Sequence, residues 1–204
     1  ALVSNTTGSS NTAVGRGALN ANTTASNNTA VGTNAMTANT TGENNTAVGL
    51  NALDGNTTGT RNTTIGYNSQ TNSTTGNNNT TCGADTMVSL STGHDNTAIG
   101  AFALNSISTA SRNVGVGNSA LEATTTGGEN TAVGEQALKS LTTGTLNTAL
   151  GRHALTKQTT ASNNTAIGAY AMRYNNNATG CVAVGLEALR GTSDGSPLSG
   201  NDNT

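Results

Sequence analysis

Residues 11–27 read Asn-Thr-Ala-Val-Gly-Arg-Gly-Ala-Leu-Asn-Ala-Asn-Thr-Thr-Ala-Ser-Asn, and close variants of this stretch follow one another along the chain. The opening motif, Asn-Thr-Ala-Val-Gly, recurs in variant form from residues 28, 45, 62, 79, 96, 113, 130, 147, 164 and 181, always at an interval of 17. A disordered chain has no physical reason to keep such a register. A stack of coils must keep it, because each side chain lies above its predecessor.

We number the positions of the repeat 1 to 17 from its first Asn. Position 5 is Gly in every repeat, which indicates a turn with positive φ or the close approach of another backbone. These predicted turn residues are Gly15, Gly32, Gly49, Gly66, Gly83, Gly100, Gly117, Gly134, Gly151, Gly168 and Gly185.

Two positions are apolar and are predicted to form the core. Position 4 is Val, Ile, Leu or Cys, and position 9 is Leu or Met except at Gln70. The core residues expected from these two columns are Val14, Leu19, Val31, Met36, Val48, Leu53, Ile65, Ile99, Leu104, Val133, Leu138, Ile167, Val184 and Leu189.

Position 1 is Asn in ten repeats, with Cys181 as the exception. A column of stacked Asn residues can form amide-to-amide hydrogen bonds along the axis, which satisfies groups that are costly to bury unpaired. The predicted ladder consists of Asn11, Asn28, Asn45, Asn62, Asn79, Asn96, Asn113, Asn130, Asn147 and Asn164.

A repeat of 17 residues is too short for a helical hairpin, and its Gly and Asn content opposes helix. Each repeat combines a β-prone stretch, a Gly turn, a small-Leu pair and a Thr-rich stretch. This pattern predicts an all-β parallel β-solenoid (a β-roll or β-helix) of about twelve coils, extending over residues 1–197. Residues 198–204 are expected to be an irregular linker into a further repeat of a longer fibre. The thin interior favours several chains that share a core.

The composition argues against an enzyme or a nucleic-acid-binding protein. Of 204 residues 31 are Asn and 40 are Thr, while charged residues make up 9% and aromatic residues 2%. The formal charge of −2 gives no reason to expect nucleic acid as a partner, and no apolar run is long enough to insert into a membrane. We expect no catalytic, cofactor or metal site, because His94 and His153 occupy different columns and the carboxylates do not cluster.

The two thiols, Cys82 at position 4 and Cys181 at position 1, lie too far apart along the stack for a disulfide within one chain. Both are expected to be small buried thiols. The alternative for Cys82 is a contact between residues of different chains. The rings of Tyr67, Phe102 and Tyr170 fall at variable positions and are expected at the surface, where rings can pack on sugars.

The run Asn-Thr-Ala-Val-Gly-x-x-Ala-Leu, followed by Asn-Thr-Thr-Gly, resembles repeats of phage tail-fibre and bacterial surface-fibre proteins. It is also similar to the head repeats of trimeric autotransporter adhesins, although the period is longer and position 2 is Thr where those heads prefer Val. The resemblance implies an extracellular homotrimeric fibre on a virion tail or cell surface. We expect the chain's partners to be further copies of itself, and a cell-surface glycan or another receptor. The alternative function is ice binding by the Thr column at position 14, which is Thr from Thr7 to Thr160.

Overall fold

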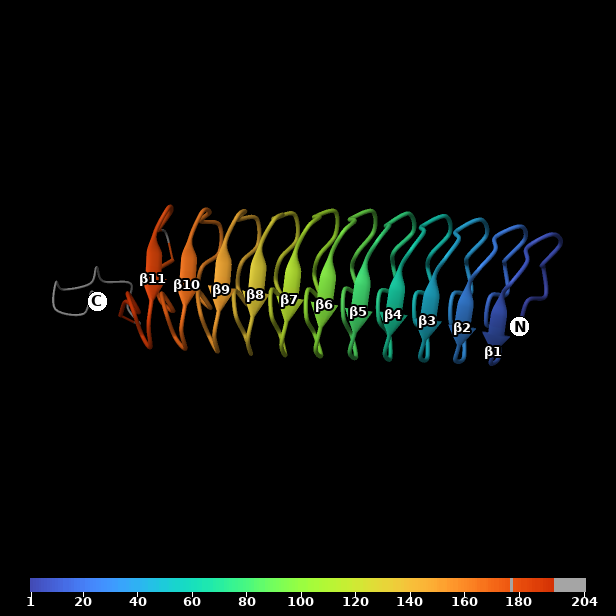
Figure 1. Cartoon of the computed structure of the whole chain (residues 1–204), viewed down its shortest axis with the longest axis horizontal. Helices are drawn as coiled ribbons and strands as arrows, with labels where there is room; N and C mark the ends of the chain where they lie inside the picture. Colours follow the sequence, from blue (N-terminus) through green and yellow to red (C-terminus); the bar gives the residue numbers. More distant parts are fainter. Residues whose placement is uncertain (177, 193–204) are drawn as a thin grey trace.

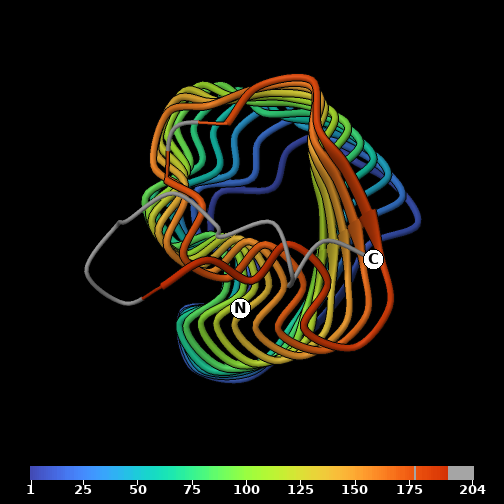
Figure 2. The same cartoon turned by 90° about the vertical axis from the view of Figure 1, so that its left-hand side faces the viewer.

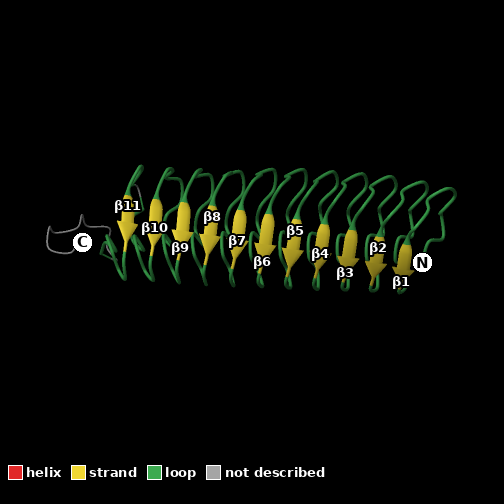
Figure 3. Ribbon diagram, in the orientation of Figure 1, coloured by secondary structure: helices red, strands yellow, loops and turns green. Residues whose placement is uncertain are grey.

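The structure, a computed structural model, describes residues 1–176 and 178–192. Eleven short strands form one parallel sheet in which the strand order follows the chain order (Figures 1 and 3). They are β1 (Thr12–Val14), β2 (Thr29–Val31), β3 (Thr46–Val48), β4 (Thr63–Ile65), β5 (Thr80–Cys82), β6 (Thr97–Ile99), β7 (Val114–Val116), β8 (Thr131–Val133), β9 (Thr148–Leu150), β10 (Thr165–Ile167) and β11 (Val182–Val184). No helix occurs in the described part of the chain.

Each strand residue pairs with the residue at the same repeat position in the next coil. Thr12 pairs with Thr29 and Ala13 with Ala30, and every later pair joins residues 17 apart. The chain is therefore a parallel β-solenoid with about ten turns between its first and last strands, fewer than the twelve coils expected. The expected number comprised eleven repeats from residue 11 and a partial repeat before them. Residues 193–204, which include the expected linker, lie outside the described residues.

Seen along its long axis, the solenoid has nearly superimposed coils with a small progressive rotation (Figure 2). Backbone hydrogen bonds join neighbouring coils outside the strands as well. For example, the N–H of Leu53 donates to the carbonyl of Ser69 at 2.9 Å, and that of Thr57 donates to the carbonyl of Thr74 at 2.9 Å. The ladder thus continues around the coil, which satisfies backbone groups that would otherwise be buried without partners.

The glycine at position 5 meets both conditions inferred from the sequence. Its φ lies between 118° at Gly100 and 144° at Gly83, a region that side chains disfavour. The next coil also passes very close: a Cβ on Gly32 would lie 2.3 Å from the carbonyl oxygen of Gly49. A side chain here would separate the coils, so Gly is required.

Three further positions of each coil adopt a positive φ, and their residues are not Gly except at Gly17 and Gly180. In the third repeat they are Asn51, Leu53 and Arg61, at positions 7, 9 and 17, with φ of 55°, 52° and 57°. The sequence carries a signal for this that a search for Gly alone misses. Thr accounts for 40 residues, yet no β-branched residue occupies any of these three positions from residue 10 to residue 189. β-branched residues are the least tolerant of positive φ.

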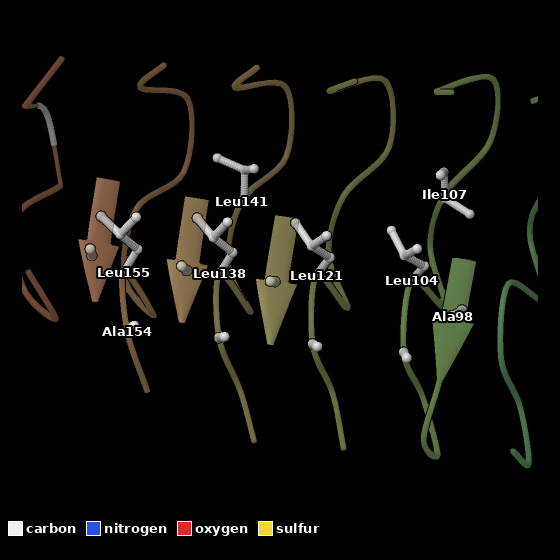
Figure 4. Close-up of a cluster of buried hydrophobic side chains, with 14 of the residues drawn as sticks. Ala98, Leu104, Ile107, Leu121, Leu138, Leu141, Ala154 and Leu155 are labelled. Carbon is white, nitrogen blue, oxygen red and sulfur yellow. The ribbon is translucent and has the colours of Figure 1, made fainter. Parts of the chain in front are cut away.

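The interior is narrow, and position 12 adds Leu90, Ile107 and Leu141 to the three apolar columns that line it. Ala at position 3, Ala at position 8 and Leu or Met at position 9 are mostly buried completely, and Leu104, Leu121, Leu138 and Leu155 stack one above another (Figure 4). All position-9 residues of the predicted core lie here, although Leu189 is only partly buried. The inward side chain of each strand is therefore the small one at position 3.

A polar layer divides this interior into two apolar clusters. One extends from Ala18 to Leu53 and the other from Met87 to Ala188. Between them, the Thr64 hydroxyl donates to Oε1 of Gln70 at 3.0 Å, and the Ser69 hydroxyl donates to that of Thr81 at 2.7 Å. The exceptional Gln70 thus belongs to a hydrogen-bonded layer in which Thr and Ser replace Ala.

Candidate functional site

The prediction that position 4 lies in the core was wrong. Successive side chains of a strand point to opposite faces, so the buried position 3 leaves positions 2 and 4 together on the outside. Every strand has this pattern, with its middle residue the most buried. The corrected residues, which are exposed or half-buried, are Val14, Val31, Val48, Ile65, Ile99, Val133, Ile167 and Val184.

The side chains at positions 2 and 4 of β1–β11 form a continuous surface, which we call the outer face. Position 2 is Thr or Val and position 4 is Val, Ile, Leu or Cys, so the outer face carries no charge on any strand. Its large apolar side chains are substantially exposed: Ile65 is 42% exposed, Leu150 47% and Val184 60%. The apolar column at position 4 extends along the whole sheet.

Cys82 belongs to the outer face and is exposed, so the expectation of a buried thiol was wrong for this residue. It was wrong for the same reason as the core prediction, because position 4 points outward. Cys181 is half-buried and packs against the end of the larger apolar cluster.

The Asn residues at position 1 form the inter-coil hydrogen bonds expected of a ladder. Oδ1 of Asn45 accepts the backbone N–H of Asn62 at 2.9 Å and also its side-chain amide at 3.2 Å. The Asn45 amide in turn donates to the carbonyl of Gly59 at 2.9 Å. Each side chain therefore bonds two adjacent coils and the turn at position 15, which is more than the amide-to-amide contact inferred from the sequence.

A second Asn ladder, which the sequence analysis missed, occupies position 12 of the first coils. The Asn22 amide donates to Oδ1 of Asn5 at 2.9 Å, Asn39 to Asn22 at 3.1 Å, and Asn56 to Asn39 at 2.8 Å. The ladder ends where Ser73 takes the next position, and Oδ1 of Asn56 is buried without a hydrogen-bond partner. The signal was present in the sequence as four Asn residues at an interval of 17.

The two Thr columns have different environments. Hydroxyls at position 13 donate to the carbonyl of the same position in the next coil, as from Thr40 to Thr57 at 3.0 Å. The Thr residues at position 14, from Thr7 to Thr160, are all exposed. A single row of threonines therefore faces outward on this side of the coil, while the outer face presents a second row at position 2.

Cationic and aromatic side chains gather on the coils that contain β9–β11. The guanidinium carbons of Arg152, Arg173 and Arg190 lie 5.6, 5.2 and 5.9 Å from the ring centre of Tyr170. The ring of His153 stacks on that of Tyr170, with centroids 5.3 Å apart. Burial, and then the neighbouring Arg152 and Arg173 cations, lower the pKa of His153. Sequence reasoning treated Tyr170 as a single surface ring and did not bring these residues together.

Among the described residues no group of three or more His, Cys, Asp or Glu is placed to hold a metal ion. His94 is exposed and contacts Asp95 at 2.8 Å, whereas His153 is buried. In the part of the chain that the structure describes, no helix is long and apolar enough to cross a membrane.

No protein-family model matches the chain, and no curated protein or solved structure matches it either.

Proposed function

We propose that this chain is a segment of a structural and adhesive fibre whose copies associate through the outer face. The supporting observation is that this face carries an apolar side chain at position 4 and no charge on all eleven strands, and that its side chains are exposed or half-buried. Parallel sheets are almost always covered on both faces, and here the coil covers only the inner one. Another copy of the chain offers a surface with the same repeat distance, so contacts made at one coil recur at the next.

The size of the outer face is compatible with such an interface. Eleven strands spaced ~4.8 Å apart, with three residues each at ~3.3 Å, give a strip of about 48 by 10 Å, or ~500 Å² before flanking residues are added. A standard stable interface covers ~800 Å² per partner. A trimer, as the resemblance to adhesin heads implies, would provide each copy with two partners.

In this proposal the fibre acts mechanically. Continuous inter-coil ladders resist bending and proteolysis, and the number of coils sets how far a receptor-binding tip stands from a virion or cell. The charged residues lie off the outer face, which leaves the remaining surface free to vary.

The test is the solution mass of the chain and of two matched variants. Ile99→Lys with Val133→Lys places two charges on the outer face, whereas Thr109→Lys with Thr143→Lys places two in the same coils at position 14. We expect sedimentation equilibrium to give three wild-type chains per particle, single chains for the first variant and unchanged assembly for the second. A folded wild-type monomer at all concentrations, or equal assembly of both variants, contradicts the proposal.

The second candidate function is ice binding. The outer face carries Thr at position 2 on nine of its eleven strands, with a spacing of ~4.8 Å between successive strands. This row lies beside the apolar row at position 4. A flat array of Thr and Val on a β-solenoid can order water in an ice-like lattice. A thermal-hysteresis measurement distinguishes the two functions, because an assembled fibre with no activity at high concentration excludes ice binding.

A further inference from the structure

Arg173 lies between two tyrosine rings at the centre of the cationic cluster. Its guanidinium carbon is 5.2 Å from the ring centre of Tyr170 and 4.9 Å from that of Tyr174. Arg190 approaches the same two rings at 5.9 and 5.8 Å. Such stacking holds a planar guanidinium in one orientation, and its edge keeps the donors that match a carboxylate or sulfate group.

Two of the three arginines of this cluster are neutralised by carboxylates. Arg152 contacts Glu135 at 3.1 Å and also donates to the Tyr170 hydroxyl at 2.5 Å, and Arg190 contacts Glu187 at 2.9 Å. Arg173 forms no ion pair within the described residues, and its buried Nε has no hydrogen-bond partner. Three guanidinium groups around one ring with only two carboxylates leave a local positive charge that an anion can neutralise.

The positive charges of the chain are concentrated toward the end that contains this cluster. Residues 130–192 contain five Lys and Arg against two Glu, whereas residues 1–129 contain three against six Asp and Glu. A long polyanion such as nucleic acid would be repelled by most of the solenoid. A short anionic ligand meets only the positive end, where the cluster covers three coils, or about 10 Å at ~4.8 Å per coil.

We propose that Arg173, held by Tyr170 and Tyr174 and flanked by Arg152 and Arg190, binds a carboxylate or sulfate group of an acidic saccharide. Asn175 and Asn176 follow Tyr174 in the chain, are half-buried and exposed respectively, and add amide groups that suit sugar hydroxyls. Saccharide binding needs no association of copies, but its use for attachment to a cell surface rests on the proposed fibre function.

The experiment is calorimetric titration of the full chain with trigalacturonate, sulfated galactotriose, uncharged galactotriose and inorganic sulfate. We expect one or both acidic trisaccharides to bind, with affinity that falls as salt is added, and uncharged galactotriose not to bind. Arg173→Gln should weaken binding at least 10-fold. Arg173→Lys, which keeps the charge but lacks the planar fork, should weaken it several-fold. Arg16→Gln, the matched control in the first coil, should leave it unchanged.

Several outcomes overturn the site. One is an Arg173→Gln variant that has a native circular dichroism spectrum and binds the acidic sugars with unchanged affinity. Another is uncharged galactotriose, or inorganic sulfate, that binds as tightly as the acidic trisaccharides. The last is a wild-type chain that binds neither acidic trisaccharide. The mass of each sample separates this proposal from the previous one. Assembled wild-type protein that binds neither acidic sugar overturns the site alone, whereas monomeric protein that binds one keeps the site and overturns the fibre.

Discussion

At position 9, each Leu or Met meets two requirements at once. The side chain of Leu53 is completely buried, while its backbone has a φ of 52°. The left-handed conformation costs an L-residue about 1–2 kcal/mol, and burial of a Leu side chain returns about 2 kcal/mol. Gly would adopt the positive φ without strain but would bury no side chain. Val or Ile would fill the core, but their branched Cβ disfavours the positive φ. A large apolar side chain unbranched at Cβ is the remaining choice, which explains why position 9 contains Leu and Met but no Ile.

We expect the stability of the chain to be sensitive to acid because of His153. Because burial and then Arg152 and Arg173 lower its pKa in the folded protein, the unfolded chain binds a proton first as the pH falls. The free energy of unfolding should therefore decrease as the pH falls through the ordinary histidine value of about 6.5, and level off below the folded pKa. Urea unfolding at pH 5 to 8 measures this decrease.

His153→Asn should reduce this decrease in stability, because it removes the imidazole that takes up the proton. The backbone should accept the substitution, since Asn34, Asn51 and Asn68 already occupy position 7 with positive φ. His94→Asn, at an exposed site, is the control and should retain it. An identical pH dependence in wild type and His153→Asn would show that another group is responsible.

At the scale of the single coil, the hydrogen-bond ladders determine the period. Asn side chains at positions 1 and 12 donate to the same carbonyl at position 15, as Asn28 and Asn39 do at Gly42. One residue deleted between these positions would place the two amides opposite the wrong neighbour at that junction. The interval of 17, the parallel register and the Gly turns could be predicted because each is a repeated chemical requirement. The position-12 ladder covers only four coils, and a pattern sought across all repeats does not reveal it.

Ser73→Asn should extend that ladder by one coil. Oδ1 of Asn56 is buried without a partner, and so is the Ser73 hydroxyl that follows it in the column. An Asn amide at this site would donate to Asn56 and to the carbonyl of Gly76, as Asn56 itself donates to Asn39 and Gly59. We expect a gain of about 1 kcal/mol in the free energy of unfolding, measured by urea denaturation.

Ser73→Ala is the matched control, because it removes the unpaired hydroxyl without supplying a donor. It should change stability by less than Ser73→Asn does. A destabilised Ser73→Asn variant would mean that the side chain does not fit beside Gly76.

At the scale of the whole molecule, the sequence could not determine which side of the sheet faces inward. A strand that reads Thr-Ala-Val can bury either Ala or Val, since period-two alternation is satisfied in both arrangements. The larger residue was expected inside because burial of apolar area usually decides. Here the Leu column already fills the narrow interior, as Leu104 and Leu121 show, and leaves room only for Ala opposite. The cationic cluster could not be predicted from the sequence either, because Arg152 and Tyr170 become neighbours only when the coils stack.

The native thiol of Cys82 can report how the copies are arranged. In a parallel assembly in register, the exposed Cys82 thiols of neighbouring copies lie at the same height on the outer face. Mild oxidation should then give disulfide-linked dimers on a non-reducing gel, and Cys181→Ser should leave them unchanged. An assembled fibre with no such product would indicate copies that are antiparallel or shifted along the axis.

The uninterrupted register has a consequence for inheritance. Each coil bonds only to the coils before and after it, and every junction has nearly the same chemistry. Slippage of a replicating polymerase by one whole repeat inserts or removes one coil and leaves all other junctions intact, while an in-frame change of another length misaligns the junction at which it occurs. The gene can therefore lengthen or shorten its product in steps of ~4.8 Å, and the length of the rod becomes a trait that single copying errors can alter.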